Sequence, residues 1–300
     1  MAAKIMEGRP VGQMIRDGVR KEISVLRDFG IKPILATIIV GDNPASKAYL
    51  RSKQSACVDV GIQSRSMELK TNVSQRELEQ VINELNLDAS VTGILLQLPL
   101  PDGLDDAAAI NAISPDKDVD GLHPFNVGQL WRKSARLVPC TPKGVIVLLR
   151  YYGIQLAGKR AVIINRTKVV GRPLAQLLLN EDATVTVCHS KTENLKEIAR
   201  EGDILVTGIG RREQFTVEAA MIKPNAAVVD IGTSMVGGKL LGDVDFDSAL
   251  DVAAFVTPVP GGVGPVTIAM LLYNTLVAAS IQRGVPLSFN PEQVSSPLRP

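Results

Sequence analysis

Apolar positions recur at helical spacing near the start of the chain. Between Pro10 and Phe29 they lie three to four residues apart, which predicts an amphipathic helix ended by Gly30. The run Ile34 to Val40 is rich in β-branched residues and predicts a buried strand. The same patterns predict helices over 46–60 and 74–86, the second opened by a Ser74–Glu77 capping box, and a buried strand over 93–98.

The alternation of strand and helix restarts in the second half. A short β-rich run is followed by the turn NRTKVVGRP and a helix that continues through Leu179. Alternating strands and helices imply a parallel sheet with helices on both faces, and here they resemble a dinucleotide-binding unit. The predicted strands cover 161–164, 184–188, 203–207, 227–231 and 255–259, and a final helix covers about 265–282.

We therefore expect an α/β protein of two domains. Residues 1–140 form an N-terminal α/β catalytic domain, and residues 141–264 form a Rossmann-like nucleotide-binding domain, with the boundary near VPCTPKG. The C-terminal helix, about 265–285, is expected to complete the first domain. The polar, proline-containing tail over 290–300 is predicted to be disordered.

Charge and cysteine content exclude several classes. The net charge is only +2, and no basic block is present, which argues against a nucleic-acid partner. The three cysteines are far apart and form no CxxC motif, and only two histidines are present, so we expect no metal site and no disulfide framework.

Membrane association is not expected either. The N-terminus MAAKIMEGRP lacks the apolar core of a signal peptide. The most apolar helix, near 268–281, carries Asn274 and Thr275 and is predicted to be too short to span a bilayer. A reducing cytoplasm is the expected location.

A lysine on an apolar helical stripe is the first candidate for chemistry. Tyr49 and Lys53 share that stripe with Ala56 and Cys57, so the Lys53 amine should be desolvated, with a pKa lowered towards neutrality. Such an amine can move protons, and Gln97, the polar residue in the apolar run ILLQLPLP, is its expected partner. Tyr-x-x-x-Lys alone favours the alternative, a lysine that reaches solvent past a packed tyrosine.

An aspartate-rich loop is the second candidate. PDKDVDGLHPFNVG begins like an EF-hand, but its twelfth position is Val127 rather than glutamate, so calcium is rejected. A solvated loop with capping aspartates is the remaining simple alternative.

The nucleotide-binding half favours NADP. The turn after its first strand is not GxGxxG, but the amides at the helix N-terminus would face a phosphate, and Arg166 could pair with one. NAD enzymes place an acid after the second strand, where this chain has Ser190 and Lys191 instead. The absence of that acid predicts NADP in preference to NAD.

Together these segments resemble the bifunctional methylenetetrahydrofolate dehydrogenase/cyclohydrolase family, from about Gly12 to Gln282. VGDNPASKAYLRSK matches the family's VG(D/E)-x-PAS…Y-x-x-x-K, and TPVPGGVGPVT resembles its closing signature. The chain departs from the family at Asn165 and Thr167, where glycine and serine are usual, so Asn165 must accept any left-handed geometry of that glycine. Arg211-Arg212 and Thr233-Ser234 are further departures.

The resemblance implies oxidation of 5,10-methylenetetrahydrofolate with NADP and hydrolysis of the methenyl product to 10-formyltetrahydrofolate, a one-carbon step that serves purine biosynthesis. It implies a folate cleft between the domains and a homodimer joined through the nucleotide-binding halves. Lys53, Tyr49 and Gln97 would be catalytic. Asp120 would hold the amino-pyrimidine edge of the pterin, and the folate would also contact Tyr49, Gln97, Pro99, Pro260 and Gly261. The cofactor would be bound by Asn165, Arg166, Thr167, Ser190, Lys191 and Thr233.

Two other interpretations remain open from the sequence. One is another NADP-dependent dehydrogenase on a similar two-domain frame, such as a shikimate-dehydrogenase-like enzyme, which leaves the Gln97 and Asp120 segments unexplained. The other is a non-catalytic NADP-binding module, which needs no lysine on an apolar stripe.

Overall fold

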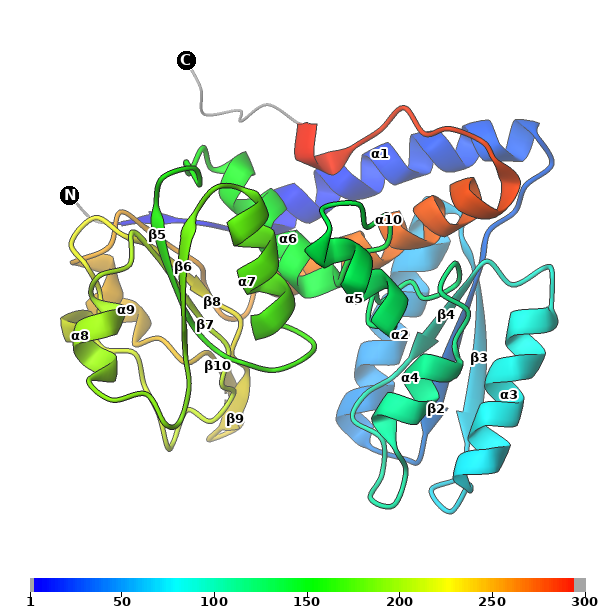
Figure 1. Cartoon of the computed structure of the whole chain (residues 1–300), viewed down its shortest axis with the longest axis horizontal. Coiled ribbons are helices and arrows are strands. Elements are labelled where there is room, and N and C mark those ends of the chain that lie inside the picture. The colour runs from blue at the N-terminus through cyan, green and yellow to red at the C-terminus, as the bar shows by residue number, and fades with distance from the viewer. Residues whose placement is uncertain (1–2, 294–300) are drawn as a thin grey trace. The chain divides into compact units, whose positions relative to one another are not determined.

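Two compact units make up the chain. The structure is a computed structural model that describes residues 3–293, apart from the side chains of residues 44–49. The three-stranded unit holds residues 14–140 and 268–290, and the six-stranded unit holds the other described residues, 3–13, 141–267 and 291–293. Each unit is built on its own parallel sheet (Figure 1).

The sheet of the three-stranded unit has the order β3-β2-β4, with all strands parallel. Its strands are β2 (Ile34–Val40), β3 (Gln63–Leu69) and β4 (Gly93–Leu96). The unit also contains most of α1 (Gly8–Asp28) and of α10 (Val263–Arg283), with α2 (Pro44–Val60), α3 (Gln75–Leu87), α4 (Asp106–Ala112) and α5 (Pro124–Trp131). Its core includes fully buried Ile38, Leu78, Ile82 and Ile94.

The sheet of the six-stranded unit has the order β1-β11-β8-β7-β5-β6 and is also parallel. Its strands are β1 (Lys4–Ile5), β5 (Arg160–Ile164), β6 (Thr184–Cys188), β7 (Ile204–Thr207), β8 (Ala227–Asp230) and β11 (Phe255–Val256). The helices are α6 (Cys140–Tyr151), α7 (Gly171–Asn180), α8 (Leu195–Ala199), α9 (Phe246–Leu250) and two 3-10 turns, Ala219–Met221 and Pro291–Gln293. A hairpin of β9 (Ser234–Val236) and β10 (Lys239–Leu241) follows β8.

The connections of the six-stranded sheet create a switch point. The chain runs from β5 outward to β6 and then returns to place β7 on the other side of β5. Ligands of open α/β sheets bind outside the carboxyl ends of the strands at such a point. The switch point therefore lies between the ends of β5 and β7.

Elements with strong local signals are where the sequence predicts them. The strands over 34–40 and 184–188 have the predicted bounds. The capping box of α3 is present, because the Glu77 amide donates to Ser74 Oγ and the Ser74 amide donates to Glu77 Oε2. β3 was not predicted, because it is a polar edge strand, QSRSMEL, with largely exposed side chains.

Three predictions need correction. Residues 3–13 belong to the six-stranded unit rather than to the N-terminal domain, because β1 pairs with β11. Pro291–Gln293 is a 3-10 turn in which Glu292 pairs with Lys143 and Arg150, so the tail is ordered at least this far. The rest of the predicted disordered tail, 294–300, lies outside the described residues.

The third correction concerns α10, which has 21 residues and is long and apolar enough to cross a membrane. The prediction that this helix is too short was wrong. However, 67% of its most apolar window is buried inside the protein, which is typical of a core helix.

Candidate functional site

A buried amine is placed against an amide in the three-stranded unit. Lys53 is on α2 and is only 7% exposed, because it shares the inward face with Leu50, Cys57 and Val60. Its Nζ donates a hydrogen bond of 2.9 Å to Oε1 of Gln97. Burial lowers the pKa of Lys53, whereas the negative charge of Asp120 acts to raise it.

Gln97 has a fixed orientation. It follows the last residue of β4, and its backbone amide continues the ladder by donating to the Ile38 carbonyl at 2.9 Å. Its side-chain Nε2 donates to the Leu98 carbonyl at 2.9 Å, which leaves Oε1 directed at Lys53. The predicted Lys53–Gln97 contact is therefore present, although Gln97 is half-buried and lies just beyond the strand rather than within it.

The two aspartates of the DVDG sequence have different surroundings. Asp118 is fully buried and accepts hydrogen bonds from the His123 amide and from Asn126 Nδ2, both at 2.8 Å. Asp120 is close enough to Lys53 for their charges to interact, and burial raises the pKa of Asp120 while Lys53 lowers it. Asp118 therefore holds the loop, whereas Asp120 lies beside Lys53 and the Cys140 thiol.

Two buried thiols flank the amine. Cys57 follows Lys53 by one helical turn, and burial raises its pKa to about 12. Burial also raises the pKa of Cys140 well above its usual range, with Asp120 adding to the effect. Both thiols are thus protonated and free of disulfides, and Cys140 also donates to the Val119 carbonyl at 3.4 Å.

The other four predicted folate contacts lie on α2, after β4 and in the loop before α10. Tyr49 is on α2 four residues before Lys53, but its side chain lies outside the described residues. Pro99 follows Gln97 by two residues and is exposed. Pro260 and Gly261 belong to the six-stranded unit, in the loop before α10. Pro99 and Pro260 both follow cis peptide bonds.

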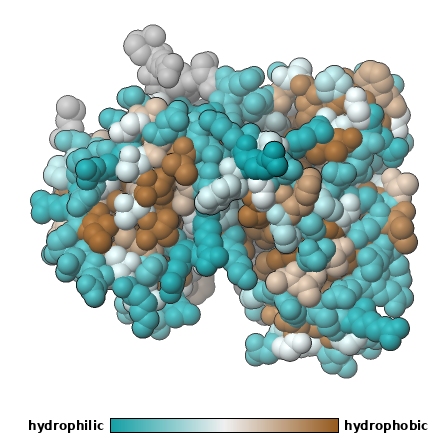
Figure 2. All heavy atoms as spheres, in the orientation of Figure 1, coloured by the Kyte–Doolittle hydropathy of each residue, from teal (hydrophilic) through white to brown (hydrophobic). Residues whose placement is uncertain are grey.

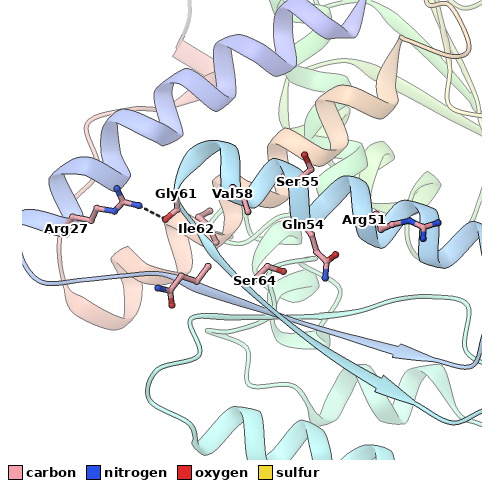
Figure 3. A pocket seen from close by; sticks show the side chains of 9 residues that line it. Arg27, Arg51, Gln54, Ser55, Val58, Gly61, Ile62 and Ser64 are labelled. Atoms are coloured by element: carbon pink, nitrogen blue, oxygen red, sulfur yellow. Dashed lines mark hydrogen bonds between the residues drawn. The ribbon is translucent and has the colours of Figure 1, made fainter.

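The opposite face of α2 lines a surface hollow of about 800 Å³ (Figure 3). Figure 3 shows Arg51, Gln54 and Val58 on the helix, with Arg27 donating to the Gly61 carbonyl at 3.1 Å. None of the predicted site residues lines this hollow, so it is separate from the Lys53 cluster.

The predicted cofactor residues gather at the carboxyl edge of the six-stranded sheet. Ile164 of β5 pairs in register with Cys188 of β6. Arg166 and Ser190 each follow their strand by two residues, so the structure brings both to the same edge. Arg166, Ser190 and Lys191 are exposed, as is Thr233, which follows β8. A cationic edge without an acid fits a nucleotide that carries a 2′-phosphate.

The Asn165 side chain joins the segments that follow β5 and β7 at the switch point. Its Oδ1 accepts hydrogen bonds from the amide and hydroxyl of Thr167, both at 2.8 Å, and from the Gly171 amide at 3.0 Å. Its Nδ2 donates to the Gly208 carbonyl after β7. Its φ is not positive, so no left-handed geometry is required of Asn165 here, and its side chain caps the turn.

Two buried aspartates at the carboxyl edge of the six-stranded sheet were not singled out from the sequence. Asp230 and Asp243 are buried near the ends of β8 and β10, where backbone amides of Gly232 and Val244 donate to Asp230. Burial raises the pKa of Asp230 to about 6. The departures from the family also interact, because the Arg212 amide donates to Ser234 Oγ at 3.0 Å. In the described part of the chain, no cluster of three His, Cys, Asp or Glu residues could hold a metal ion.

A parallel sheet with a switch point and a cationic edge defines a dinucleotide-binding α/β protein, to which the three-stranded unit adds a buried amine hydrogen-bonded to an amide. Residues 6–120 match the family "Tetrahydrofolate dehydrogenase/cyclohydrolase, catalytic domain". Residues 139–283 match "Tetrahydrofolate dehydrogenase/cyclohydrolase, NAD(P)-binding domain". The chain belongs to the tetrahydrofolate dehydrogenase/cyclohydrolase family.

Individual relatives agree with this assignment. The chain is 48% identical to the bifunctional protein FolD of Nitrosopumilus maritimus over 281 residues, 94% of this chain and 98% of that protein. The crystal structure of the bifunctional enzyme FolD of Campylobacter jejuni has a TM-score of 0.90 and 44% identity, covering 93% of this chain and 99% of that one. The FolD structure of Trypanosoma brucei complexed with NADP and inhibitor has a TM-score of 0.88 and 42% identity, covering 94% and 98%.

The predicted family, the two-domain α/β fold and the bifunctional dehydrogenase and cyclohydrolase activity are thereby confirmed, with a nucleotide of the NAD(P) class as cofactor. The family match decides against the shikimate-dehydrogenase-like and the non-catalytic interpretations. The roles of single residues stay predictions.

Proposed function

We propose that this chain oxidises 5,10-methylenetetrahydrofolate with NADP and hydrolyses the methenyl product at the Lys53 cluster. The observation that carries the assignment is the buried Lys53 amine, hydrogen-bonded to Gln97 and within electrostatic reach of Asp120. The direct test measures the absorbance of methenyltetrahydrofolate formed from methylenetetrahydrofolate with NADP, and then its loss as it is hydrolysed. Absence of the signal with both NADP and NAD would contradict the proposal.

The two steps place different demands on the protein. NADP supplies the hydride acceptor when it is bound. The first step needs the folate held in position and no protein base, because the methylene carbon loses a hydride. The second step adds water and needs a proton acceptor, and a lysine whose pKa is lowered by burial suits that role.

Asp120 is proposed to bind the pterin. A carboxylate can accept paired N–H donors from an amino-pyrimidine edge. Because Asp118 is occupied by Asn126 and the His123 amide, Asp120 is the aspartate of the pair that remains for a ligand. Tyr49, Pro99, Pro260 and Gly261 are proposed as further folate contacts, and the cleft between the domains stays a prediction.

NADP is the proposed cofactor in preference to NAD. Arg166 and Ser190 lie at the same edge of the sheet, and Lys191 adds a second exposed cation. The Asn165 side chain keeps the turn from β5 to α7, which contains Arg166, closed, since it bonds to Thr167, Gly171 and Gly208. The turn thus presents Arg166 outward, where a 2′-phosphate can pair with its guanidinium.

We also propose a homodimer joined through the six-stranded units. β6 is an edge strand of the sheet, and Figure 2 shows hydrophobic residues gathered over α7 and β6. Leu179 is 53% exposed and Val187 37% exposed. A dimer through this edge would cover both side chains and the unpaired strand. Light scattering tests this: Val187→Lys should yield monomers, whereas a wild-type protein that is monomeric at micromolar concentration contradicts it.

A cytoplasmic location is proposed from the thiols. All three cysteines are free and buried, and a protein of the reducing cytoplasm needs no disulfide. Fractionation of cells that express the protein natively would test this.

A further inference from the structure

Asn274 is a buried polar side chain in the otherwise apolar helix α10. It is 2% exposed and belongs to the same compact unit as Lys53 and Asp120. Its Nδ2 donates to the carbonyls of Val119 and Val138, each at 2.8 Å. Both partners are acceptors, and the NH₂ group of the amide supplies one donor to each. A buried amide is costly without partners, and here both donors are used.

The two carbonyls belong to the segments that carry the polar residues around Lys53. Val119 directly precedes Asp120, so its carbonyl is part of the peptide that sets the position of Asp120. Val138 precedes Cys140 by two residues, and Cys140 Sγ lies 3.5 Å from the same Nδ2 and 3.4 Å from the Val119 carbonyl. One side chain therefore ties together two segments that lie more than 130 residues before it in the sequence.

The loop before Asp120 is anchored along its whole length. Gln282, two turns further along α10, donates from Nε2 to the Thr92 carbonyl at 2.7 Å and to the Asp116 carbonyl at 3.0 Å. Asn126 donates to the Pro115 carbonyl and to Asp118. Asn274 is thus the last of these anchors before Asp120, and it acts on the peptide bond next to the proposed ligand group.

We propose that Asn274 is a positioning residue of the folate site, which holds Asp120 and Cys140 in place beside Lys53. This inference rests on the proposed function. The Asn274 side chain bonds to the two carbonyls and the thiol and is not given a contact with substrate. Loss of the Asn274 amide would leave the buried carbonyls of Val119 and Val138 without this donor, which is costly. The Val119–Asp120 peptide should therefore rotate away from the Lys53 amine.

A purely structural role is the competing explanation, and the neighbouring residue provides a matched control. Thr275 is fully buried on the same helix, and its Oγ1 bonds to the Leu271 carbonyl one turn earlier, at 2.9 Å. Thr275→Val removes a buried polar group from α10 without touching the loop. Any effect of α10 destabilisation alone should therefore be shared by this variant.

The experiment uses two variants of Asn274 in the full chain. Asn274→Asp is isosteric and turns a carboxyl oxygen towards the carbonyls, whereas Asn274→Ser removes the amide without adding a charge. Steady-state kinetics should show the KM for methylenetetrahydrofolate raised about tenfold or more in both, since buried hydrogen bonds of this kind contribute roughly tenfold in affinity. The dissociation constant for NADP, measured by calorimetry, should change less than about twofold, because no NADP contact is removed.

The pH profile of hydrolysis gives a readout that simple destabilisation would not move. Asp120, Cys140 and Cys57 each act to raise the pKa of Lys53, and the effect of Asp120 is the largest of the three. If Asp120 is displaced in Asn274→Ser, the pKa of Lys53 loses this upward influence. The acidic limb of the hydrolysis profile should then shift to lower pH, while Thr275→Val keeps the wild-type limb.

The outcomes separate the two proposals. A wild type that forms no methenyltetrahydrofolate contradicts the proposed function, and this inference with it. An active wild type with Asn274→Ser and Asn274→Asp kinetics equal to those of Thr275→Val contradicts this inference alone. If Asn274→Asp does not fold, the comparison of Asn274→Ser with Thr275→Val at a temperature below both melting points decides it.

Discussion

Nζ of Lys53 lies 2.9 Å from Oε1 of Gln97, although 44 residues separate the two in sequence. The bond joins the inward face of α2 to the end of β4, and it places the amine where burial opposes its charge. Gln97 uses its other polar atoms on the backbone, so its side chain has little freedom to follow a moving amine. The amine is therefore pre-positioned before any substrate binds.

The first prediction separates the two chemical steps at Lys53. Lys53→Met keeps the apolar stem and removes the amine, so it should reduce hydrolysis of methenyltetrahydrofolate by about 10²–10⁴-fold, the usual contribution of a positioned acid or base. Dehydrogenase activity should fall less, because hydride loss needs no base. The assay supplies methenyltetrahydrofolate and subtracts its spontaneous hydrolysis. Arg51→Met, on the exposed face of α2, is the control, and near-normal hydrolysis by Lys53→Met would show that Lys53 is only packed there.

The second prediction concerns folate binding by Asp120. Asp120→Ala should raise the KM for folate in both activities, because the same pterin is bound in each. Removing a charge-assisted hydrogen bond typically costs about 1.5–3 kcal/mol, or roughly tenfold or more in affinity. NADP affinity, measured separately, should hardly change. Asp116→Ala removes an exposed carboxylate from the same loop and should behave like wild type; equal folate affinity in both variants would refute the assignment.

The third prediction tests which cationic side chain contacts the 2′-phosphate of NADP. Arg166→Ala should weaken NADP by roughly tenfold or more, the usual effect of one lost phosphate contact, and should weaken NAD much less. Lys168→Ala is the matched control, because Lys168 is an exposed cation in the same turn. Titration of each variant with both nucleotides gives the ratio directly. Equal losses of NADP and NAD affinity in Arg166→Ala would show that Arg166 does not contact the 2′-phosphate.

How much of this could be predicted from the sequence depends on the range of each interaction. Helices such as α3 are set by local periodicity and caps, so their bounds follow from the sequence. The Lys53–Gln97 contact was also predictable, because each residue is a polar exception within an apolar pattern. The polar edge strand β3 carried no such pattern and was missed.

The parts of the site that were missed depend on contacts distant in sequence. Asn274 could be recognised as a polar residue in an apolar helix, but its partners Val119 and Val138 are 155 and 136 residues away. The role of Asn165 was also missed, because a resemblance compares residue types without their side-chain bonds. Its carboxamide closes the turn through bonds to Thr167 and Gly171, which the sequence does not indicate.

The last prediction concerns the dependence of stability on pH. Burial raises the pKa of Asp230 from 3.8 to about 6 in the folded protein. Below about pH 4 the carboxyl is protonated in both the folded and the unfolded chain, so it imposes no cost. As the pH rises from about 4 to 6, the unfolded chain ionises first, and the free energy of unfolding should fall by about 3 kcal/mol through this group.

Asp230→Asn should flatten this part of the pH profile, because its amide does not ionise. The variant keeps an oxygen for the Gly232 amide but loses the acceptor for Val244, so its overall stability should be lower. Urea unfolding at half-unit steps between pH 4 and 7 measures the slope. Asp247→Asn, at an exposed position on α9, should retain the wild-type slope. If Asp230→Asn retains that slope as well, the ionisation of Asp230 is not what makes the six-stranded unit sensitive to pH.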